Sequence, residues 1–293
     1  MRKACMVLYR CSWIVFIGYC AAGFFYDLPY LWGWLPLGLA LTLASVMNRR
    51  PGEGAKPASA AAGEARATGT DPAPGTEGAV RAGKPTPVEV DPPVSGRWSA
   101  LNSPADSVPS HGTHAYGQTY AIDIVAEPAD GARPGFGWWP LVRHNRAFPA
   151  FGAPLLAVAD ATVVRATDRQ RDHLSRNSFP ALLYLLVEGM FREMGGPSRI
   201  TGNHLVLDLG DGTYAMYAHL QRGSLTVRAG DRVRAGQRLA RCGNSGNSSE
   251  PHVHFQLMDH PDLDVARGIP FTWRGVGVPR GGEVFTVAEH ATV

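Results

Sequence analysis

Closely spaced turn-forming residues after Gly96 limit the fold of this chain more than any other feature. Gly, Asp and Asn interrupt the sequence every several residues, and the stretches between them alternate apolar and polar side chains. Short strands bounded by such residues are typical of all-β domains. We therefore expect a mainly β domain over 96–275, an antiparallel sheet of the barrel-sandwich kind.

Several segments within this range have the pattern of individual strands. A hairpin is expected across Gly210-Asp211-Gly212, where glycine supplies the positive φ that a tight turn requires. The other expected strands lie around Asp160 and in the alternating run 225–237. The last segment of the sheet is expected at Val253 to Met258.

One segment breaks the β pattern. Residues Pro180 to Met194 place leucines, Met190 and Phe191 at helical spacing, and Gly195-Gly196-Pro197 ends the run. We expect a helical insertion near 170–197. Two interpretations stay open: a helix that packs its apolar stripe on the sheet, and a helix that serves as a lid or touches a membrane.

The first fifty residues are strongly apolar. Two runs, Cys11 to Phe25 and Leu28 to Met47, each approach membrane-spanning length. No small-x-small cleavage site follows the first run, so we expect residues 1–50 to form a retained helical membrane anchor, either a hairpin or a single span.

The charges beside the anchor bear on which side of the membrane the domain lies. Arg2, Lys3 and Arg10 precede the hairpin, and Arg49 and Arg50 follow it. The positive-inside rule would place both flanks of a hairpin, and therefore the domain, in the cytoplasm. A single span would place the domain outside, so the charge pattern leaves the side open.

The remaining parts of the chain carry few signals. Residues 51–95 are rich in Pro, Gly and Ala and are expected to form a disordered linker, and 276–293 a C-terminal tail. A net charge of +3 gives no support for a nucleic-acid partner. Cys242 is the single cysteine after the anchor, which excludes a disulfide within the domain.

Histidines near the C-terminal end of the domain have the pattern of a metal site. His252 and His254 follow the turn Gly243-Asn244-Ser245-Gly246, and in a strand they point to the same face. Two imidazoles that converge in this way suit a hydrolytic zinc site, which needs three protein ligands and one open position for water.

Further candidates lie elsewhere in the chain. His219 ends the expected hairpin strand, and His111 and His114 lie in a loop upstream. Asp123 stands between apolar neighbours, where a carboxylate must be paired or bind a metal because a bare charge is costly to bury. His204, at a strand start, is expected to be half-exposed and structural.

These segments together resemble the lysostaphin/LytM family of zinc metallopeptidases, over approximately Trp98 to Met258. The resemblance rests on the H-x-H block with its Gly-Asn-Ser-Gly turn, the Tyr-Ala-His-Leu block at 217–220 and the alternating block at 227–237. It implies one zinc ion bound by His111, Asp123 and His254. It also implies that His219 and His252 are catalytic, and that a peptide of peptidoglycan is the substrate.

The first motif departs from the family pattern. The family has a short H-x-x-x-D spacing, and this chain has Thr119 where that histidine would fall. The histidine must then come from an upstream loop, and both His111 and His114 remain candidates, with His111 preferred for its Ser-His-Gly setting.

Two rival interpretations were weighed. The block at 227–237 also resembles half of a lipoyl or biotinyl carrier domain, but no lysine follows Gly96 to carry the group. A catalytically inactive LytM-like module that activates other wall hydrolases is the alternative to an enzyme. We expect an active peptidase at the cell membrane, with its domain placed outside the cytoplasm on the implied function alone.

Overall fold

The computed structural model describes residues 2–23, 25–26, 28–48, 86–128 and 133–288. The longer helices are α1 (Arg2–Ala22), α2 (Trp34–Met47) and α3 (Phe179–Met194), with the short helices η1 (Tyr30–Gly33), η2 (Ala115–Tyr120), η3 (Asn145–Ala147) and α4 (Pro197–Thr201). The strands are β1 (Val88–Val90), β2 (Gly96–Asn102), β3 (Ile122–Ala126), β4 (Pro154–Leu156), β5 (Ala161–Thr167), β6 (His204–Gly210), β7 (Thr213–Ala218), β8 (Arg232–Val233), β9 (Arg238–Arg241), β10 (Val253–Met258), β11 (Gly268–Ile269), β12 (Phe271–Trp273) and β13 (Val284–Val287).

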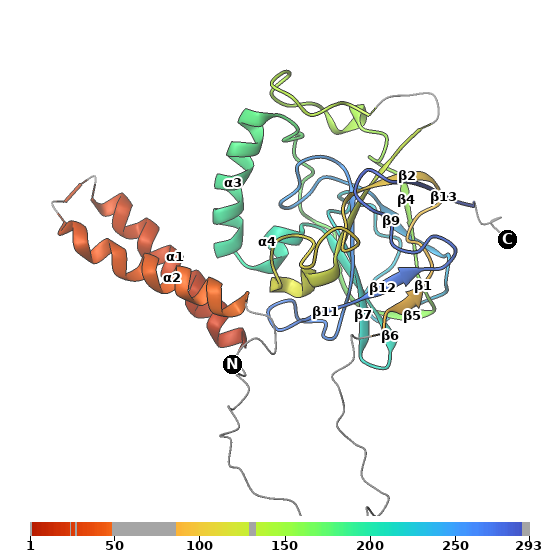
Figure 1. Ribbon diagram of the computed structural model, residues 1–293, viewed down its shortest axis with the longest axis horizontal. Coiled ribbons are helices and arrows are strands. Elements are labelled where there is room, and N and C mark those ends of the chain that lie inside the picture. The colour runs from red at the N-terminus through yellow and green to blue at the C-terminus, as the bar shows by residue number, and fades with distance from the viewer. Residues whose placement is uncertain (1, 24, 27, 49–85, 129–132, 289–293) are drawn as a thin grey trace, which may run out of the picture.

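One large antiparallel sheet organises the domain. Its strands follow the order β13-β2-β3-β10-β7-β6-β5-β8, and β11 pairs with β10. Two small sheets accompany it, the antiparallel pair β4-β9 and the parallel pair β1-β12. The expected mainly β, antiparallel fold is confirmed (Figure 1).

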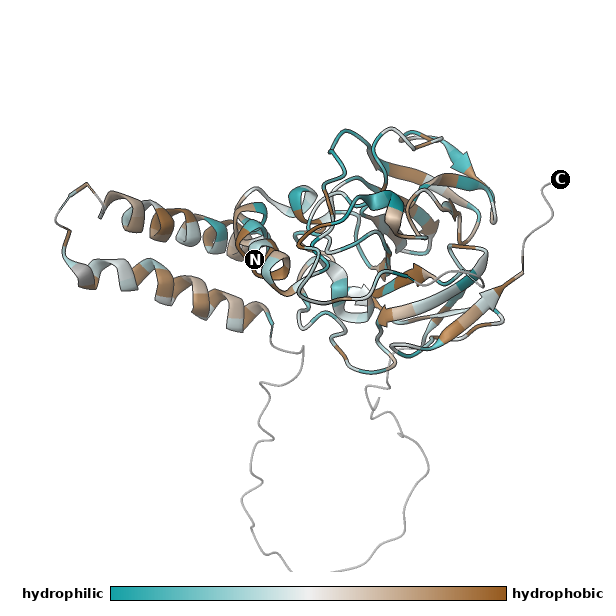
Figure 2. Ribbon diagram, turned by 90° about the horizontal axis from the view of Figure 1, so that it is seen from above, coloured by the Kyte–Doolittle hydropathy of each residue, from teal (hydrophilic) through white to brown (hydrophobic). Residues whose placement is uncertain are grey.

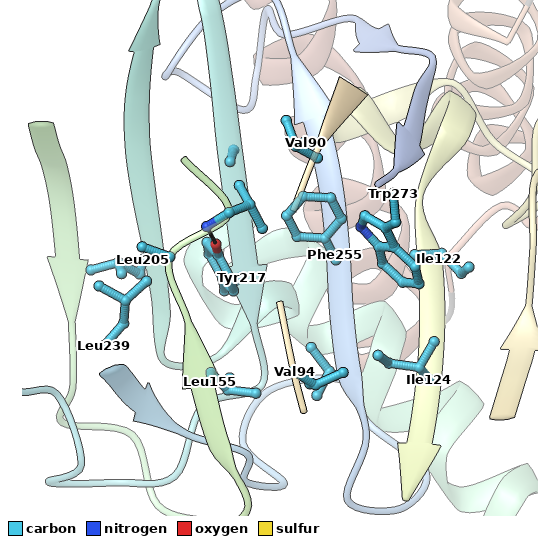
Figure 3. Close-up of a cluster of buried hydrophobic side chains, with 14 of the residues drawn as sticks. Val90, Val94, Ile122, Ile124, Leu155, Leu205, Tyr217, Leu239, Phe255 and Trp273 are labelled. Carbon is cyan, nitrogen blue, oxygen red and sulfur yellow. Dashed lines mark hydrogen bonds between the residues drawn. The ribbon is translucent and has the colours of Figure 1, made fainter. Parts of the chain in front are cut away.

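The large sheet has two faces with different contents. On β10, Phe255 and Leu257 point into the main hydrophobic core, which also receives Ile122 and Ile124 from β3 (Figure 3). Because side chains alternate along a strand, the residues between them must point to the opposite face. Asp123 is one of these, and the opposite face therefore receives the polar side chains of β3 and β10.

Strands on both sides of the expected domain, 96–275, join its sheets. β1 pairs with β12 and brings Val90 into the core, although 51–95 is expected as linker. β13 pairs with β2 and buries Phe285 and Val287, although 276–293 is expected as tail. Both strands are short, three and four residues, so the sequence gave little sign of them. Residues 51–85 of the expected linker lie outside the described residues.

The helical insertion is present as α3 and α4. The Ser178 hydroxyl accepts a hydrogen bond from the backbone N–H of Ala181, which is a normal N-terminal cap, and Pro180 suits the first turn. The helix ends at Met194, before Gly195 and Gly196. Ala181 and Leu185 are the buried residues of α3.

The apolar N-terminus forms a helical hairpin in which α1 and α2 lie side by side (Figures 1 and 2). Among the described residues, α1 alone is long and apolar enough to cross a membrane, and Leu31–Met47 is a shorter apolar helix. Met6, on α1, is buried against the domain next to Tyr116. The hairpin therefore extends outward from a base that is packed on the β domain.

Candidate metal centre

Three neighbouring strands place the candidate ligands. Asp123 on β3 and His254 on β10 stand directly opposite each other in the antiparallel register. On the other side of β10, His254 is opposite Ala218 of β7, so His219 comes immediately after that strand. Residues far apart in the sequence are thus brought together by strand pairing.

The Asp123 carboxylate lies at the centre of the cluster. Its Oδ2 lies 2.9 Å from Nε2 of His111, and its Oδ1 lies 2.9 Å from Nδ1 of His254. Nε2 of His252 is 3.5 Å from the same Oδ1. The Asn102 side-chain amide also donates to Oδ2, at 2.8 Å. One buried carboxylate therefore faces three imidazoles.

Hydrogen bonds around His111 indicate which nitrogen of its ring carries the proton and which presents a lone pair to the carboxylate of Asp123. The Ser110 hydroxyl has one proton, which it donates to the carbonyl of Ala121 at 2.6 Å, so it accepts from Nδ1 of His111 at 3.0 Å. In a neutral ring, Nε2 is then an acceptor that faces the carboxylate of Asp123. Two acceptors at this distance need a proton or a cation between them.

His219 and His252 are held by backbone carbonyls. Nδ1 of His219 donates to the carbonyl of Ser245 at 2.8 Å, and Nδ1 of His252 donates to the carbonyl of Glu250 at 2.8 Å. The two rings lie 4.8 Å apart between centroids. Each ring keeps Nε2 for a partner in the cluster, where it can accept or, once protonated, donate a proton.

His254 is fixed from its other side by Gln256. Nε2 of His254 lies 3.0 Å from Oε1 of Gln256, whose amide nitrogen donates to the carbonyl of Tyr116 at 2.7 Å. The amide is thereby oriented with its oxygen toward the ring. With Nε2 protonated, Nδ1 presents its lone pair toward Asp123, as a metal ligand requires.

Burial and mutual charge set the ionisation of the cluster. Burial alone would raise the pKa of Asp123, but the imidazoles of His111 and His252 lower that pKa well below its usual range. Burial, together with the neighbouring His252 and His254, lowers the pKa of His219 well below its usual value. His219 is therefore neutral at pH 7. Burial opposes a charge on His252 too, but Asp123 raises the pKa of that ring above its usual value.

The donor set suits a metal ion. His111, Asp123 and His254 offer one ligand atom each within 4.8 Å of one another, and His219, His252 and His254 do the same. Imidazole nitrogen with one carboxylate oxygen is a ligand set that zinc accepts. The two sets share His254.

Other histidines of the sequence analysis lie outside the cluster. Nδ1 of His114 contacts the hydroxyl of Thr119 at 2.9 Å, and His114 belongs to neither donor set. His204 is completely buried, so the expectation of a half-exposed ring is wrong. Its Nδ1 contacts the hydroxyl of Thr201 and the carbonyl of Gly202, just before β6, and a strand start in the sequence gives no sign of such cover.

Three residues that the sequence analysis did not single out support the site. Asn102 carries no motif, and its contact with Asp123 arises only in the folded chain. Ser110 belongs to the Ser-His-Gly setting of His111, but its contact with Nδ1 of that ring is seen only in the folded chain. Gln256 had a signal, because it continues the alternation of His252 and His254 by two residues.

Strands β3 and β10 and the adjoining loops gather four histidines and one aspartate into one cluster, so the protein is a mainly β domain with a candidate metal centre. The model of peptidase family M23 matches residues 186–264, a range that holds His219, His252 and His254 but not His111 or Asp123. The matched part of the chain, residues 186–264, belongs to this family, of the lysostaphin/LytM type.

Two curated relatives match part of the chain. The glycyl-glycine endopeptidase ALE-1 of Staphylococcus capitis is 39% identical over 72 residues, which are 24% of this chain and 19% of that protein. The peptidoglycan DD-endopeptidase ShyA of Vibrio cholerae is 30% identical over 83 residues, 28% of this chain and 17% of that protein. The chain thus spans less than a fifth of the length of either relative.

A solved structure was also found to be similar. The catalytic domain of lysostaphin from Staphylococcus simulans is 24% identical, with a TM-score of 0.27, and the match covers 46% of this chain and 85% of that chain.

Proposed function

We propose that this chain is a zinc-dependent endopeptidase that hydrolyses peptide cross-links of peptidoglycan and is attached to a membrane by its N-terminal hairpin. The match to a peptidase family supports the proposed hydrolase activity. The relatives, a glycyl-glycine endopeptidase and a peptidoglycan endopeptidase, support the proposed substrate. The observation that carries the proposal is the convergence of His111, Asp123 and His254 around one point.

We assign His111, Asp123 and His254 as the ligands of one zinc ion. This set contains the carboxylate, whose negative charge offsets part of the charge of the ion, and it matches the ligand types of hydrolytic zinc sites. When bound, zinc would polarise the scissile carbonyl and lower the pKa of a water molecule toward neutrality.

We assign His219 and His252 as the catalytic histidines. Both rings are anchored through Nδ1, so that Nε2 of each is directed to the cluster and can exchange a proton with water or substrate. Neutral His219 suits a base, and His252, with its raised pKa, suits a donor to the carbonyl oxygen that becomes negative.

The substrate would approach from the side of His111. The His111 side chain is 16% exposed, against 7% for His252 and 5% for His254. A peptide carbonyl that enters along this side meets the ligand cluster first, with the catalytic pair beyond it.

The test uses the full chain, purified with its hairpin and supplied with zinc. Metal content is measured, and cross-linked peptidoglycan is digested and analysed by mass spectrometry for newly released amino termini. We expect about one zinc per chain and cleavage of peptide bonds that disappears after chelation. Bound zinc without cleavage, and with no phenotype for His219→Ala, would instead support a module that activates other wall hydrolases.

A further inference from the structure

The outward side of α3 is an exposed apolar stripe. Leu183 and Leu186 are 65% and 62% exposed, although Ala181 and Leu185 of the same helix are buried against the domain. The stripe has the spacing of one helical face. Its members are Leu182, Leu183, Leu186, Val187, Met190 and Phe191.

A loop extends this stripe at the N-terminal end of α3. The ring of Phe179 lies 4.7 Å from that of Phe136 and 4.8 Å from that of Trp138, between centroids. Trp138 and Trp139 are themselves 71% and 77% exposed. Aromatic rings in such numbers on a surface are uncommon unless the surface contacts something apolar.

The hairpin extends the stripe at the other end. Tyr9, Trp13 and Ile17 of α1 line one groove together with Gly189, Met190 and, at its end, Glu193 of α3. The hairpin leaves the domain on the same side as α3 (Figure 1). Loop, α3 and hairpin therefore form one continuous apolar surface.

The base of the hairpin is fixed to the domain by charge pairs. A nitrogen of the Arg10 guanidinium lies 2.5 Å from a carboxylate oxygen of Asp264 and donates to the Tyr116 hydroxyl at 3.1 Å. Lys3 pairs with Asp262 at 2.6 Å, an exposed contact. Tyr116 also donates to Glu193, near the end of α3. These contacts hold the hairpin, α3 and the loop of His111 in one orientation.

We propose that α3 and the loop 136–139 lie on the surface of the same bilayer that the hairpin enters, with their apolar side chains at the boundary of headgroups and acyl chains. The proposal rests on the membrane attachment proposed above. Leu and Phe on one face are typical of a helix that lies in this boundary, and the exposed tryptophans of the loop extend that face. Arg176 and Arg192 are mostly buried and pair with Glu188, so the apolar side chains of the stripe carry the proposal.

A bilayer is favoured over a protein partner because the stripe is continuous with the hairpin, in which α1 has the length and composition of a membrane-spanning helix. The peptidase site would then be held close to the membrane and not at the end of a long tether. Its substrates would be the peptides of peptidoglycan that lie next to the membrane surface.

The experiment maps contact with lipid. The full chain is reconstituted into vesicles of phosphatidylethanolamine and phosphatidylglycerol that contain a photoactivatable lipid, and labelled peptides are identified by mass spectrometry. We expect label in α1, in α3 and at 136–139. Val284 and Val164, which are 45% and 38% exposed, are the controls and should stay unlabelled.

Variants sharpen the result. The double substitution Leu183→Glu with Leu186→Glu should reduce the label in α3 and at 136–139 by about fivefold or more, with the label in α1 unchanged. Both leucines are exposed, so the fold does not depend on them, and unchanged zinc content verifies this. Val284→Glu is the matched control and should change none of the labelling.

Each contrary outcome has a distinct meaning. Label in the hairpin without label in α3 would overturn the surface contact and leave the membrane attachment standing. No label anywhere would overturn the membrane attachment itself. Cross-links from α3 to a second copy of the chain, in place of lipid, would make this face a protein interface and overturn the assignment to the bilayer.

Discussion

Gln256 accepts a hydrogen bond from Nε2 of His254 at 3.0 Å, and the two residues stand two positions apart on the same face of β10. The carbonyl of Tyr116 holds the Gln256 amide in this orientation. The opposite nitrogen of His254 faces Asp123, so the orientation of one amide determines which nitrogen of the ring is available to a metal ion.

We expect Gln256→Leu to weaken zinc binding by roughly 10 to 100-fold, because the ring of His254 loses the acceptor that fixes its tautomer. Competition with a chelator of known affinity measures this. Gln256→Glu keeps an acceptor at the same place and should retain most of the affinity. Equal zinc affinities for Gln256→Leu and the unaltered chain would show that Gln256 does not position the ligand.

The two candidate histidines of the first motif differ in their contacts. His111→Ala should lose zinc, because Nε2 of His111 is 2.9 Å from Asp123, whereas His114→Ala should keep it, because that ring contacts Thr119. Metal content by atomic absorption decides the matter. Loss of zinc in His114→Ala alone would reverse the assignment.

His219→Ala should retain zinc and lose hydrolysis by roughly 10²- to 10⁴-fold, the usual contribution of a positioned acid or base. Zinc content and digestion of peptidoglycan are measured on the same preparation. If His219→Ala loses the metal instead, the ion is held by His219, His252 and His254, the second of the two donor sets.

His204 predicts a pH dependence of stability. Burial lowers its pKa, Nδ1 donates to the carbonyl of Gly202, and Nε2 has no partner among the described residues. In the unfolded chain this histidine therefore binds a proton near pH 6.5, whereas in the folded chain it stays neutral at that pH. The contribution of His204 to the free energy of unfolding is complete above pH 6.5. As the pH falls below 6.5, this contribution decreases by about 1.4 kcal/mol per pH unit, until the lowered pKa is reached.

Urea unfolding between pH 7.5 and 5.5, at saturating zinc, measures this effect. His204→Gln removes the titrating group, so its unfolding free energy should fall less steeply with pH than that of the unaltered chain. Parallel curves for the two proteins would exclude His204 as the cause.

Gly246→Ala should destabilise the fold by about 2 to 4 kcal/mol. Gly246 has φ of +75°, and an added Cβ would lie 2.4 Å from the backbone nitrogen of Gly202, so neither loop can accept it. Gly210→Ala is the matched control, since its φ is +89° but the space around it is open. It should cost only about 1 to 2 kcal/mol, the backbone strain alone. Similar losses of unfolding free energy would show that the contact between loops is unimportant.

Much of the fold was predictable because local sequence patterns indicate its helices and strands. Alternation and glycine turns predicted the hairpin of β6 and β7 and the strand β10, and helical spacing predicted α3. The short strands β1 and β13 were not predicted, because one buried residue in β1 and two in β13 carry too little pattern. Strand pairing across long stretches of sequence, which builds the large sheet, has no local signal at all.

The candidate site shows the same division. The alternation of His252 and His254 was readable from sequence, whereas the approach of His111 to Asp123 depends on the path of a loop. Asn102 is an ordinary polar residue until the fold places it beside Asp123, and nothing in the sequence shows that Ser110 contacts the ring of the neighbouring His111. Motifs in the sequence therefore do not predict the side chains that hold the candidate ligands in position.

The direct opposition of Asp123 and His254 across β3 and β10 ties metal loading to correct folding. If β10 slipped by one residue, Phe255 would face the carboxylate and His254 would enter the hydrocarbon interior. A chain with this register could neither bind the proposed zinc ion nor form the native hydrophobic core. The fraction of molecules that carry metal would then serve as a direct assay of how much of a preparation has reached its native strand alignment.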